Sequence, residues 1–526
     1  MEDIKGMIFT PSTSHIKLSV LLSIVFLINN ISFAQQAKSN IPKANWYNLN
    51  PTSGGMLGIS MDKAYDELLK GKTARPIIVA VIDGGLDFQH DDLKNMLWTN
   101  PKEIPNNRID DDHNGYIDDI HGWNFLGNLT ESYELGNELI VLEIREYRKK
   151  FGNKDSTQVA RKNLQDYRKF LSKQMELDTK LKKLNQDIDN ASSLLADLNI
   201  IQKKIGKENL NLDDLKTYKP VDATEANVTQ FMISVLLNNP DFKNYIVRTK
   251  EAYERNQQLA KYKLNINYNP RANHVDRRDR FYGNGNIYGS VPPAHGTHVA
   301  GIIAAERNND LGINGVADHV QLMTIRAIPD GHAPGEDQAN AIRYAADNGA
   351  KVINMSFGLG LQTDAQMIRD AINYALEKDI LFVCAAGNDS ANIDLNTAFP
   401  DRKSKADQSF ADVFLKVGAS GFTEEAGLMV PFSNYGLENV DIFAPGLGIT
   451  STIPGNKYEA HSGTSMAAPV VTGLAAVIRE YYPQLNAKQV KRIIMESVVK
   501  KDGLKNLCAS GGIANAYNAL KIAATY

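Results

Sequence analysis

The feature that most constrains the fold is an alternation of β-branched strand patterns with amphipathic helix patterns. A continuous apolar run, IIVAVID, begins at Ile77 and stops at Asp83, which is the pattern of a strand buried on both faces. The alternation returns later, where the strand patterns VQLMTIRAI, KVINMS, ILFVCAAGN and VFLKVGAS are interleaved with the helical patterns EDQANAIRYAADNG and DAQMIRDAINYALEKD. This order predicts an α/β fold, in which a parallel sheet is flanked by helices on both faces.

A long polar stretch, residues 126–268, interrupts this alternation. No proline occurs between Pro105 and Pro220, and apolar residues step by three and four along one stripe, at Leu181, Leu184, Ile188, Ala191, Leu195 and Leu198. The stripe predicts one long helix within a large helical insertion. Two arrangements fit the insertion: a helical hairpin packed on the body of the protein, or a projecting arm that contacts substrate or a partner.

The N-terminus has the pattern of a secretory signal peptide. Lys17 precedes the apolar run LSVLLSIVFLI, and small residues follow at Ser32 and Ala34. The run is too short to span a bilayer, and an ordinary buried helix is the alternative interpretation. We expect cleavage after Ala34, a secreted or periplasmic protein, and no membrane anchor once the signal peptide is removed.

Composition gives little support for nucleic acid or an anionic membrane surface as a partner. The 526 residues carry a formal net charge of −3, and 43% of them are hydrophobic, as in ordinary globular proteins. The chain has two cysteines, Cys384 and Cys508. Export allows them to form one disulfide bond, but Cys384 lies in an apolar run that is typical of a buried thiol, so the pairing stays open.

Three polar residues have the side-chain types that a serine nucleophile and the two groups that activate it require. Asp83 ends the first strand pattern, His295 begins HGTHVAG, and Ser465 lies in GTSMAAP at the start of a helical pattern. Each alone has a structural explanation, as a turn residue, a loop residue or a residue at a helix start. Together they supply a serine hydroxyl, an imidazole that accepts its proton, and a carboxylate that orients the imidazole.

Such a nucleophile also needs donors for the negative charge that develops on the substrate oxygen. Asn388, in CAAGN at a predicted strand end, offers a side-chain amide, and a backbone N–H near Ser465 at the helix start offers a second donor. Pro469 follows within the same helix, where it removes one backbone donor and is expected to bend the first turns.

The stretches VIDGG, HGTHVAG, AAGN and HSGTSMAAP resemble the motifs of the subtilisin-like serine peptidases, the subtilases, in wording and in order. The resemblance covers roughly residues 75–125 and 280–520. It implies a subtilisin-like fold, with Asp83 as the orienting acid, His295 as the general base, Ser465 as the nucleophile and Asn388 as the oxyanion donor. It further implies that two short segments bind substrate, formed by Ser356, Phe357 and Gly358 and by Ala385, Ala386 and Gly387.

On this resemblance we expect an exported serine-type endopeptidase that hydrolyses proteins or peptides through an acyl-enzyme intermediate, without an organic cofactor. A binding protein that kept the fold without turnover is one alternative. An ester hydrolase is another, but the sequence around Ser465 lacks the G-x-S-x-G pattern of that class. We divide the chain into a signal peptide (1–34), an N-terminal segment (35–75), a peptidase domain (76–125 and 269–526) and the helical insertion (126–268).

The acidic run DDDHNGYIDD, which begins at Asp110, has the start of a calcium-binding loop. Its D-x-D-x-N-G core places oxygen ligands around a glycine that permits a sharp bend. His121 stands where an EF-hand has its bidentate Glu, so this is a different loop, similar to an acidic loop of some subtilases. We expect structural calcium, with a solvated acidic turn as the alternative; the candidate ligands are Asp110, Asp112, Asn114, Asp118 and Asp119.

Overall fold

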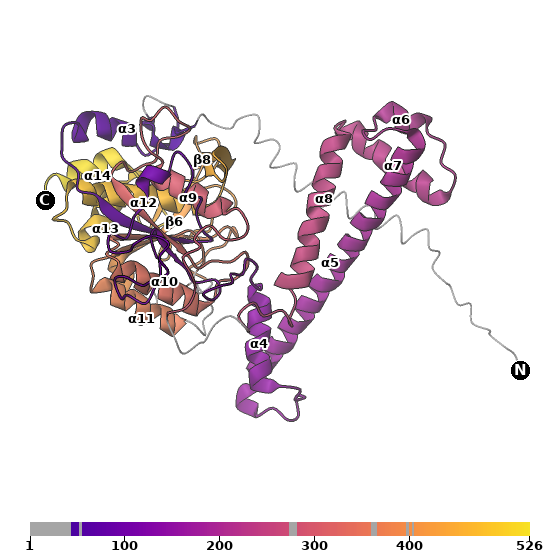
Figure 1. Cartoon of the computed structure of the whole chain (residues 1–526), viewed down its shortest axis with the longest axis horizontal. Helices are drawn as coiled ribbons and strands as arrows, with labels where there is room; N and C mark the ends of the chain where they lie inside the picture. The colour runs from indigo at the N-terminus through magenta and orange to yellow at the C-terminus, as the bar shows by residue number, and fades with distance from the viewer. Residues whose placement is uncertain (1–43, 52–54, 273–280, 359–364, 396–398, 402–403) are drawn as a thin grey trace, which may run out of the picture. The chain divides into compact units, whose positions relative to one another are not determined.

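The computed structural model describes residues 44–51, 55–272, 281–358, 365–395, 399–401 and 404–526. They form two compact units, one of residues 44–136 with 269–526 and one of residues 137–268 (Figure 1). The first unit contains a mostly parallel sheet flanked by helices and the second is helical, so the predicted α/β fold with a helical insertion is confirmed.

The predicted signal peptide lies outside the described residues. Within them, no helix has the length and apolar character needed to cross a membrane.

One nine-stranded sheet forms the centre of the first unit, in the order β10-β11-β7-β6-β5-β4-β1-β3-β2. All neighbouring strands are parallel except β10 and β11. A separate antiparallel pair is formed by β8 (Ile449–Ile453) and β9 (Lys457–His461). The strands of the large sheet are β1 (Ile77–Asp83), β2 (Gly122–Asn124), β3 (Val320–Arg326), β4 (Val352–Met355), β5 (Leu381–Ala385), β6 (Phe414–Ser420), β7 (Ile442–Pro445), β10 (Val499–Lys500) and β11 (Gly512–Ile513).

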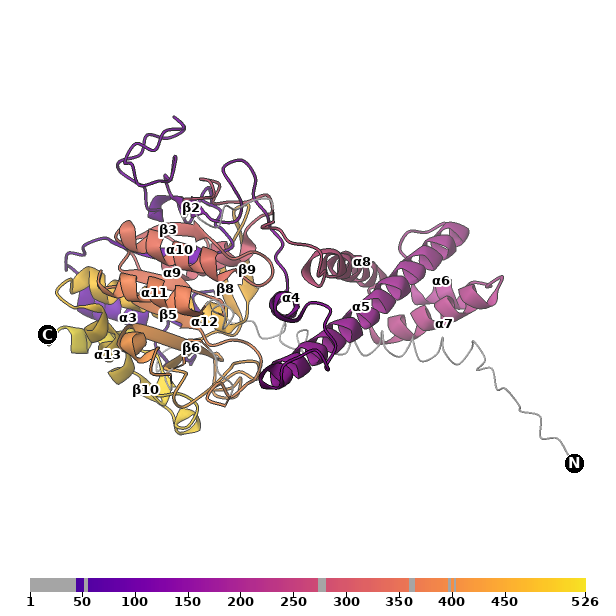
Figure 2. The ribbon, with the colours of Figure 1, turned by 90° about the horizontal axis from the view of Figure 1, so that it is seen from below.

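Helices cover both faces of this sheet. On one face lie α9 (Ala294–Ala304) and α12 (Thr464–Tyr481), and on the other lie α10 (Gly335–Asp347) and α11 (Ala365–Leu376), as Figures 1 and 2 show. The two helices predicted from sequence are therefore α10 and α11. Among the described residues, the remaining α-helices of this unit are α3 (Met61–Ala64), α13 (Ala487–Glu496) and α14 (Ala516–Ala523).

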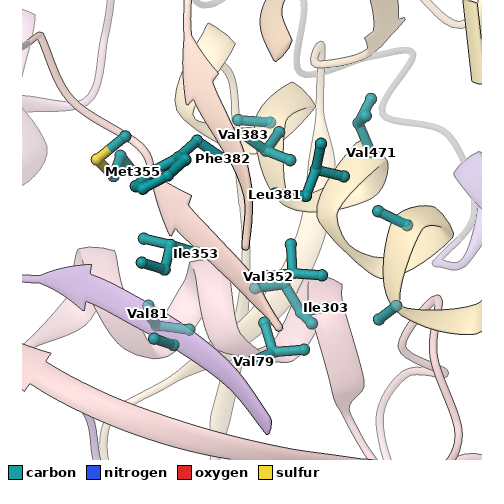
Figure 3. Packing of buried hydrophobic residues seen from close by; sticks show 14 of the residues in the cluster. Val79, Val81, Ile303, Val352, Ile353, Met355, Leu381, Phe382, Val383 and Val471 are labelled. Atoms are coloured by element: carbon teal, nitrogen blue, oxygen red, sulfur yellow. The ribbon is translucent and has the colours of Figure 1, made fainter. Parts of the chain in front are cut away.

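The strand register explains why the β-branched runs form the core. Val79, Val352 and Leu381 are neighbours across β1, β4 and β5, so their side chains share one face of the sheet. Figure 3 shows them packed towards Ile303 of α9 and Val471 of α12, and all five are fully buried. Full burial stabilises the fold by about 1.5–3 kcal/mol for each side chain of this size. The core thereby fixes both helices, which begin at the edge of the sheet discussed below.

The second unit has its own apolar clusters. It consists of α4 (Leu139–Phe151), α5 (Leu164–Ile205), α6 (Leu212–Thr217), α7 (Ala223–Asn238) and α8 (Phe242–Gln258). The predicted long helix is α5, with 42 residues. Its first half packs in one cluster that includes Leu184, and its second half packs in another that includes Leu194 and Leu198. The buried stripe thus moves from the expected Leu195 to Leu194, because the helix changes packing partners between the clusters.

The two chain ends of this helical unit are held together by Arg145. Its guanidinium donates to Asn137 Oδ1 at 2.8 Å, to the carbonyl oxygen of Ile266 at 2.9 Å, and to the carbonyl oxygen of Tyr268. The unit therefore begins and ends at one place.

Both cysteines are buried thiols and neither is in a disulfide bond. Cys384 packs in the main core, whereas Cys508 belongs to a separate apolar cluster with Val440 and Phe443. The pairing that the sequence left open is therefore absent, because the two residues fill different parts of the interior.

Candidate active site

Three adjacent strands end at the same edge of the sheet and place polar residues there. Ile82 pairs with Met355, and Met355 pairs with Cys384, so β1, β4 and β5 finish side by side. Asp83 is the last residue of β1, Ser356 follows β4, and Asn388 lies three residues after β5. The carboxyl ends of parallel strands are where α/β proteins place their ligands and chemistry.

His295 lies in the first turn of α9 and is bound to Asp83. Its Nδ1 lies 2.9 Å from Asp83 Oδ1 and 3.0 Å from Oδ2. Because a carboxylate only accepts, Nδ1 carries the proton, and Nε2 is left as the basic nitrogen of the neutral ring. Burial disfavours the charged ring, but the charge and hydrogen bond of Asp83 outweigh it and raise the pKa of His295. Asp83 itself is buried and accepts a second hydrogen bond, from the backbone N–H of Gly84 at 2.7 Å.

The close approach of α9 to this strand end requires a glycine after the histidine. A Cβ atom on Gly296 would lie 2.0 Å from the carbonyl oxygen of Gly85 and 3.1 Å from Asp83 Oδ1. No side chain fits there, so steric exclusion explains why a glycine follows the histidine in HGTHVAG.

Ser465 lies in the first turn of α12, where it exchanges hydrogen bonds with Ser356. Its hydroxyl donates to the carbonyl oxygen of Ser356 at 3.0 Å, and the Ser356 hydroxyl donates to the carbonyl oxygen of Ser465 at 2.9 Å. The Ser465 carbonyl is available because Pro469, four residues later, has no N–H to donate to it. The helix continues through Pro469 to Tyr481. In this conformation, Ser465 and His295, which are both described, have no hydrogen bond to each other.

Asn388 is an exposed residue whose amide orientation is fixed by Thr464. Asn388 Oδ1 accepts from the Thr464 backbone N–H and from the Thr464 hydroxyl, both at 2.9 Å. The same hydroxyl accepts from the backbone N–H of Gly387 at 3.1 Å. With its oxygen occupied, the amide turns its Nδ2 donor the other way, and that nitrogen is 3.7 Å from the Cβ position of Gly463, just before the helix. Sequence reasoning missed Thr464, although it stands in the GTSMAAP stretch.

The two predicted substrate-binding segments lie at the ends of the paired strands β4 and β5, and so lie next to each other. The side chain of Ser356 is buried, and both its hydroxyl and its carbonyl oxygen are hydrogen-bonded to Ser465. Phe357 packs partly against the core and Gly358 is exposed. Ala385 and Ala386 are buried and Gly387 is half-buried.

A pair of imidazoles that the sequence analysis did not identify lies near His295. His298 and His461 stack in parallel, with ring centroids 4.3 Å apart and an angle of 4° between the planes. Burial lowers the pKa of His298 to about 3, and burial also lowers the pKa of His461. Both rings are therefore neutral at neutral pH and add no positive charge beside His295. In the sequence, the signal that could have pointed to this pair was the second histidine of HGTHVAG, His298.

The acidic loop brings together part of its predicted ligand set. Glu103, Asp110 and Asp112 offer carboxylate oxygens that lie within 4.8 Å of one another. Glu103, which sequence reasoning missed, also accepts from the backbone N–H groups of Asp111 at 2.9 Å and Asp118 at 3.1 Å. Three carboxylates at this separation fit a hard divalent cation, because oxygen donors suit calcium and like charges otherwise repel.

The other predicted ligands of this loop have partners of their own. Asn114 Oδ1 accepts from the backbone N–H of Tyr116 at 2.8 Å. Asp118 accepts from the backbone N–H of Arg108 at 2.9 Å. Asp119 is buried and accepts from the Tyr344 hydroxyl at 2.6 Å, and its burial raises the pKa of Asp119 to about 6.

The chain is similar in sequence to a family of known proteins. The family model Peptidase_S8, described as "Subtilase family", matches residues 74–511. The chain is 40% identical over 227 residues to "Thermophilic serine proteinase" of Bacillus sp. (strain AK1), which covers 43% of this chain and 52% of the relative. It is 37% identical over 226 residues to "Alkaline elastase YaB" of Bacillus sp. (strain YaB), with coverage of 42% and 54%. It is 34% identical over 224 residues to "Subtilisin BL" of Lederbergia lenta, with coverage of 42% and 73%. The chain spans about half the length of the first two relatives.

Proposed function

The chain belongs to the subtilase family, and from this premise we propose that it is an exported serine endopeptidase that hydrolyses proteins or peptides. The observation that carries the proposal is the bond between His295 Nδ1 and both oxygens of the buried Asp83, 2.9 and 3.0 Å long. This bond leaves Nε2 of His295 as a basic nitrogen at the edge of the sheet where α12, the helix of Ser465, begins.

In the proposed mechanism, rotation about the Cα–Cβ bond of Ser465 moves its hydroxyl from the Ser356 carbonyl to His295. The imidazole takes the hydroxyl proton as the serine oxygen attacks the carbonyl carbon of the peptide bond. Asp83 stabilises the imidazolium that forms. The imidazolium then gives its proton to the departing amine, which leaves the acyl group on Ser465 as an ester. A water molecule, activated by the same imidazole, releases the acid product.

The negative oxygen formed in each attack needs donors that are already in place. Asn388 Nδ2 supplies one, since Thr464 holds the oxygen of the same amide. The backbone N–H of Ser465 supplies the second; none of the bonds found among the described residues uses it, and it lies at the positive end of α12. The segments that start at Ser356 and Ala385 would hold the substrate on the two sides of this centre.

The experiment that tests the activity compares the purified protein with its Ser465→Ala variant on unfolded casein. We expect cleavage by the parent protein and none by the variant. Ser462→Ala is the matched control, because Ser462 is an exposed serine three residues away that accepts from the Gly448 backbone N–H. Equal cleavage by the parent protein and Ser465→Ala would refute the assignment, and a folded parent protein without cleavage would favour a binding function.

We also propose that the acidic loop binds structural calcium through Glu103, Asp110 and Asp112. Support comes from the three carboxylates within 4.8 Å, a donor set that suits this ion. Bound calcium would stabilise the folded state by mass action. A chelator should therefore lower the unfolding temperature of the Ser465→Ala variant, which cannot digest itself, and calcium should restore it.

Export and the domain boundaries belong to the same proposal. The pattern before Ala34 supports removal of a signal peptide, which N-terminal sequencing of the exported protein would test by a mature start at Gln35.

The insertion of residues 126–268 contains the compact helical unit of residues 137–268. That it contacts substrate or a partner stays a prediction, which a variant without residues 137–268 would test on substrates of different size.

A further inference from the structure

A second cluster of ionisable side chains lies at the amino-terminal ends of the parallel strands, opposite the carboxyl ends where Asp83 lies. Asp318 and His319 directly precede β3, and Glu480 is the penultimate residue of α12. Each of the three offers a ligand atom, and these atoms lie within 4.8 Å of one another. Glu480 is fifteen residues from Ser465, about 22 Å along the helix at 1.5 Å per residue. The cluster is therefore remote from the proposed chemistry.

Glu480 is the unusual member of this cluster. It is completely buried, and neither of its carboxylate oxygens has a hydrogen-bond partner among the described residues. Asp318 Oδ1 also lacks a hydrogen bond there, although it lies 3.0 Å from His319 Nδ1, and Asp318 Oδ2 accepts from the Tyr481 hydroxyl at 3.1 Å. A buried ionised carboxylate is strongly disfavoured unless a positive charge or donors compensate it.

Two states would satisfy these carboxylates. In one, Glu480 is protonated: burial, followed by the charge of Asp318, raises the pKa of Glu480 well above its usual range. In the other, a cation lies between them. Arg307, which influences the neighbouring tyrosines electrostatically, is already bound to Asp62 at 2.6 Å and to the Gly315 carbonyl oxygen. A protonated pair uses the backbone N–H of His319 but leaves its imidazole without a role, whereas a metal ion uses all three side chains.

We propose that Asp318, His319 and Glu480 bind a divalent transition-metal ion of the zinc class. Two carboxylates and one imidazole suit zinc, which takes nitrogen and oxygen donors and readily keeps water in a fourth position. Calcium fits less well because it takes oxygen ligands. The side chain of His319 is 49% exposed, which gives an ion a path to the buried Glu480. The ion would fasten the C-terminal end of α12 to the start of β3 and stabilise the fold without entering the reaction.

The test uses the full chain with Ser465→Ala, which excludes self-digestion, in saturating calcium so that the acidic loop is filled. Zinc chloride is titrated by calorimetry, and the unfolding temperature is measured with and without zinc. We expect one zinc ion per chain and a rise of about 3–4 °C at a hundredfold excess over the Kd. No rise in the unfolding temperature would overturn the proposal.

Variants identify the ligands. His319→Ala should weaken zinc binding at least about tenfold while leaving the zinc-free protein folded, because His319 is exposed. Glu480→Gln should abolish the zinc-dependent rise, and its neutral amide removes the repulsion by Asp318. His113→Asn is the control, since His113 is an exposed histidine beside acidic residues and asparagine tolerates its positive φ of 59°. Parental zinc binding by His319→Ala, or loss of binding in His113→Asn, would refute the site.

Discussion

Replacing Thr464 by valine should separate the positioning of Asn388 from its donor function. Thr464 is fully buried, so water does not replace its hydroxyl, and valine has nearly the same shape. The change removes one of the two hydrogen bonds that hold Asn388 Oδ1. A neutral hydrogen bond contributes about 1 kcal/mol, which corresponds to about a fivefold fall in kcat. The upper limit is the loss of the donor itself, about 10²- to 10³-fold, as expected for Asn388→Ala.

The assay is steady-state hydrolysis of a chromogenic peptide by five proteins: the parent, Thr464→Val, Thr464→Ser, Asn388→Ala and the double variant of Thr464→Val with Asn388→Ala. We expect the Thr464 change to lower kcat at nearly constant KM in the parent, and to have little further effect once Asn388 is absent. Thr464→Ser keeps the hydroxyl and should keep most of the activity. Thr464→Val also leaves the backbone N–H of Gly387 without its acceptor, which should cost about 1 kcal/mol of stability.

Two results would refute this reasoning. One is an equal fall in kcat from Thr464→Val in the presence and absence of Asn388. The other is a Thr464→Ser variant as slow as Thr464→Val, since the methyl group would then matter more than the hydroxyl.

Three further predictions concern the other parts of the site. Asp83→Asn should lower kcat by about 10⁴-fold; because Asp83 raises the pKa of His295 and the base must be neutral, kcat/KM should fall as pH drops through that pKa, and a pH profile should show this limb at lower pH in the variant. Glu103→Gln should remove the effect of calcium on the unfolding temperature, and a variant that still responds like the parent would exclude Glu103 as a ligand. Gly296→Ala should destabilise the protein by at least about 1–3 kcal/mol in urea unfolding, because its Cβ would lie 2.0 Å from the Gly85 carbonyl oxygen; an unchanged midpoint would contradict this close contact.

The part of the fold that local pattern determines was predictable from sequence. A strand buried on both faces must be apolar throughout, so the runs ending at Asp83 and Ala385 were readable, and the polar residues after them had to meet at one edge. The resemblance to subtilases then assigned roles to these residues. The shift from Leu195 to Leu194 was not predictable, because it depends on which helices pack against each half of α5.

Residues whose neighbours are distant in the chain escaped prediction for a physical reason. Glu103 looks like an ordinary surface acid until the loop folds back on it. His461 has a partner 163 positions earlier, and Glu480 lies beside a residue 162 positions earlier, and no periodicity joins either pair. Glu480 in an amphipathic helix would be expected on its solvent face, yet it is buried.

The hydrogen bonds by which Arg145 joins the two chain ends of the helical unit change the entropy that the chain loses on folding. Asp83 and His295 are 212 positions apart, and a flexible loop of that length loses conformational entropy when its ends meet. The helical unit accounts for 132 of those positions, from 137 to 268, and its joined ends let the chain pass through it as through a short bridge. The loop that must close then behaves as one of about 80 residues, which lowers its closure cost by about 0.9 kcal/mol. An insertion that folds early would therefore assist, rather than delay, the meeting of Asp83 and His295.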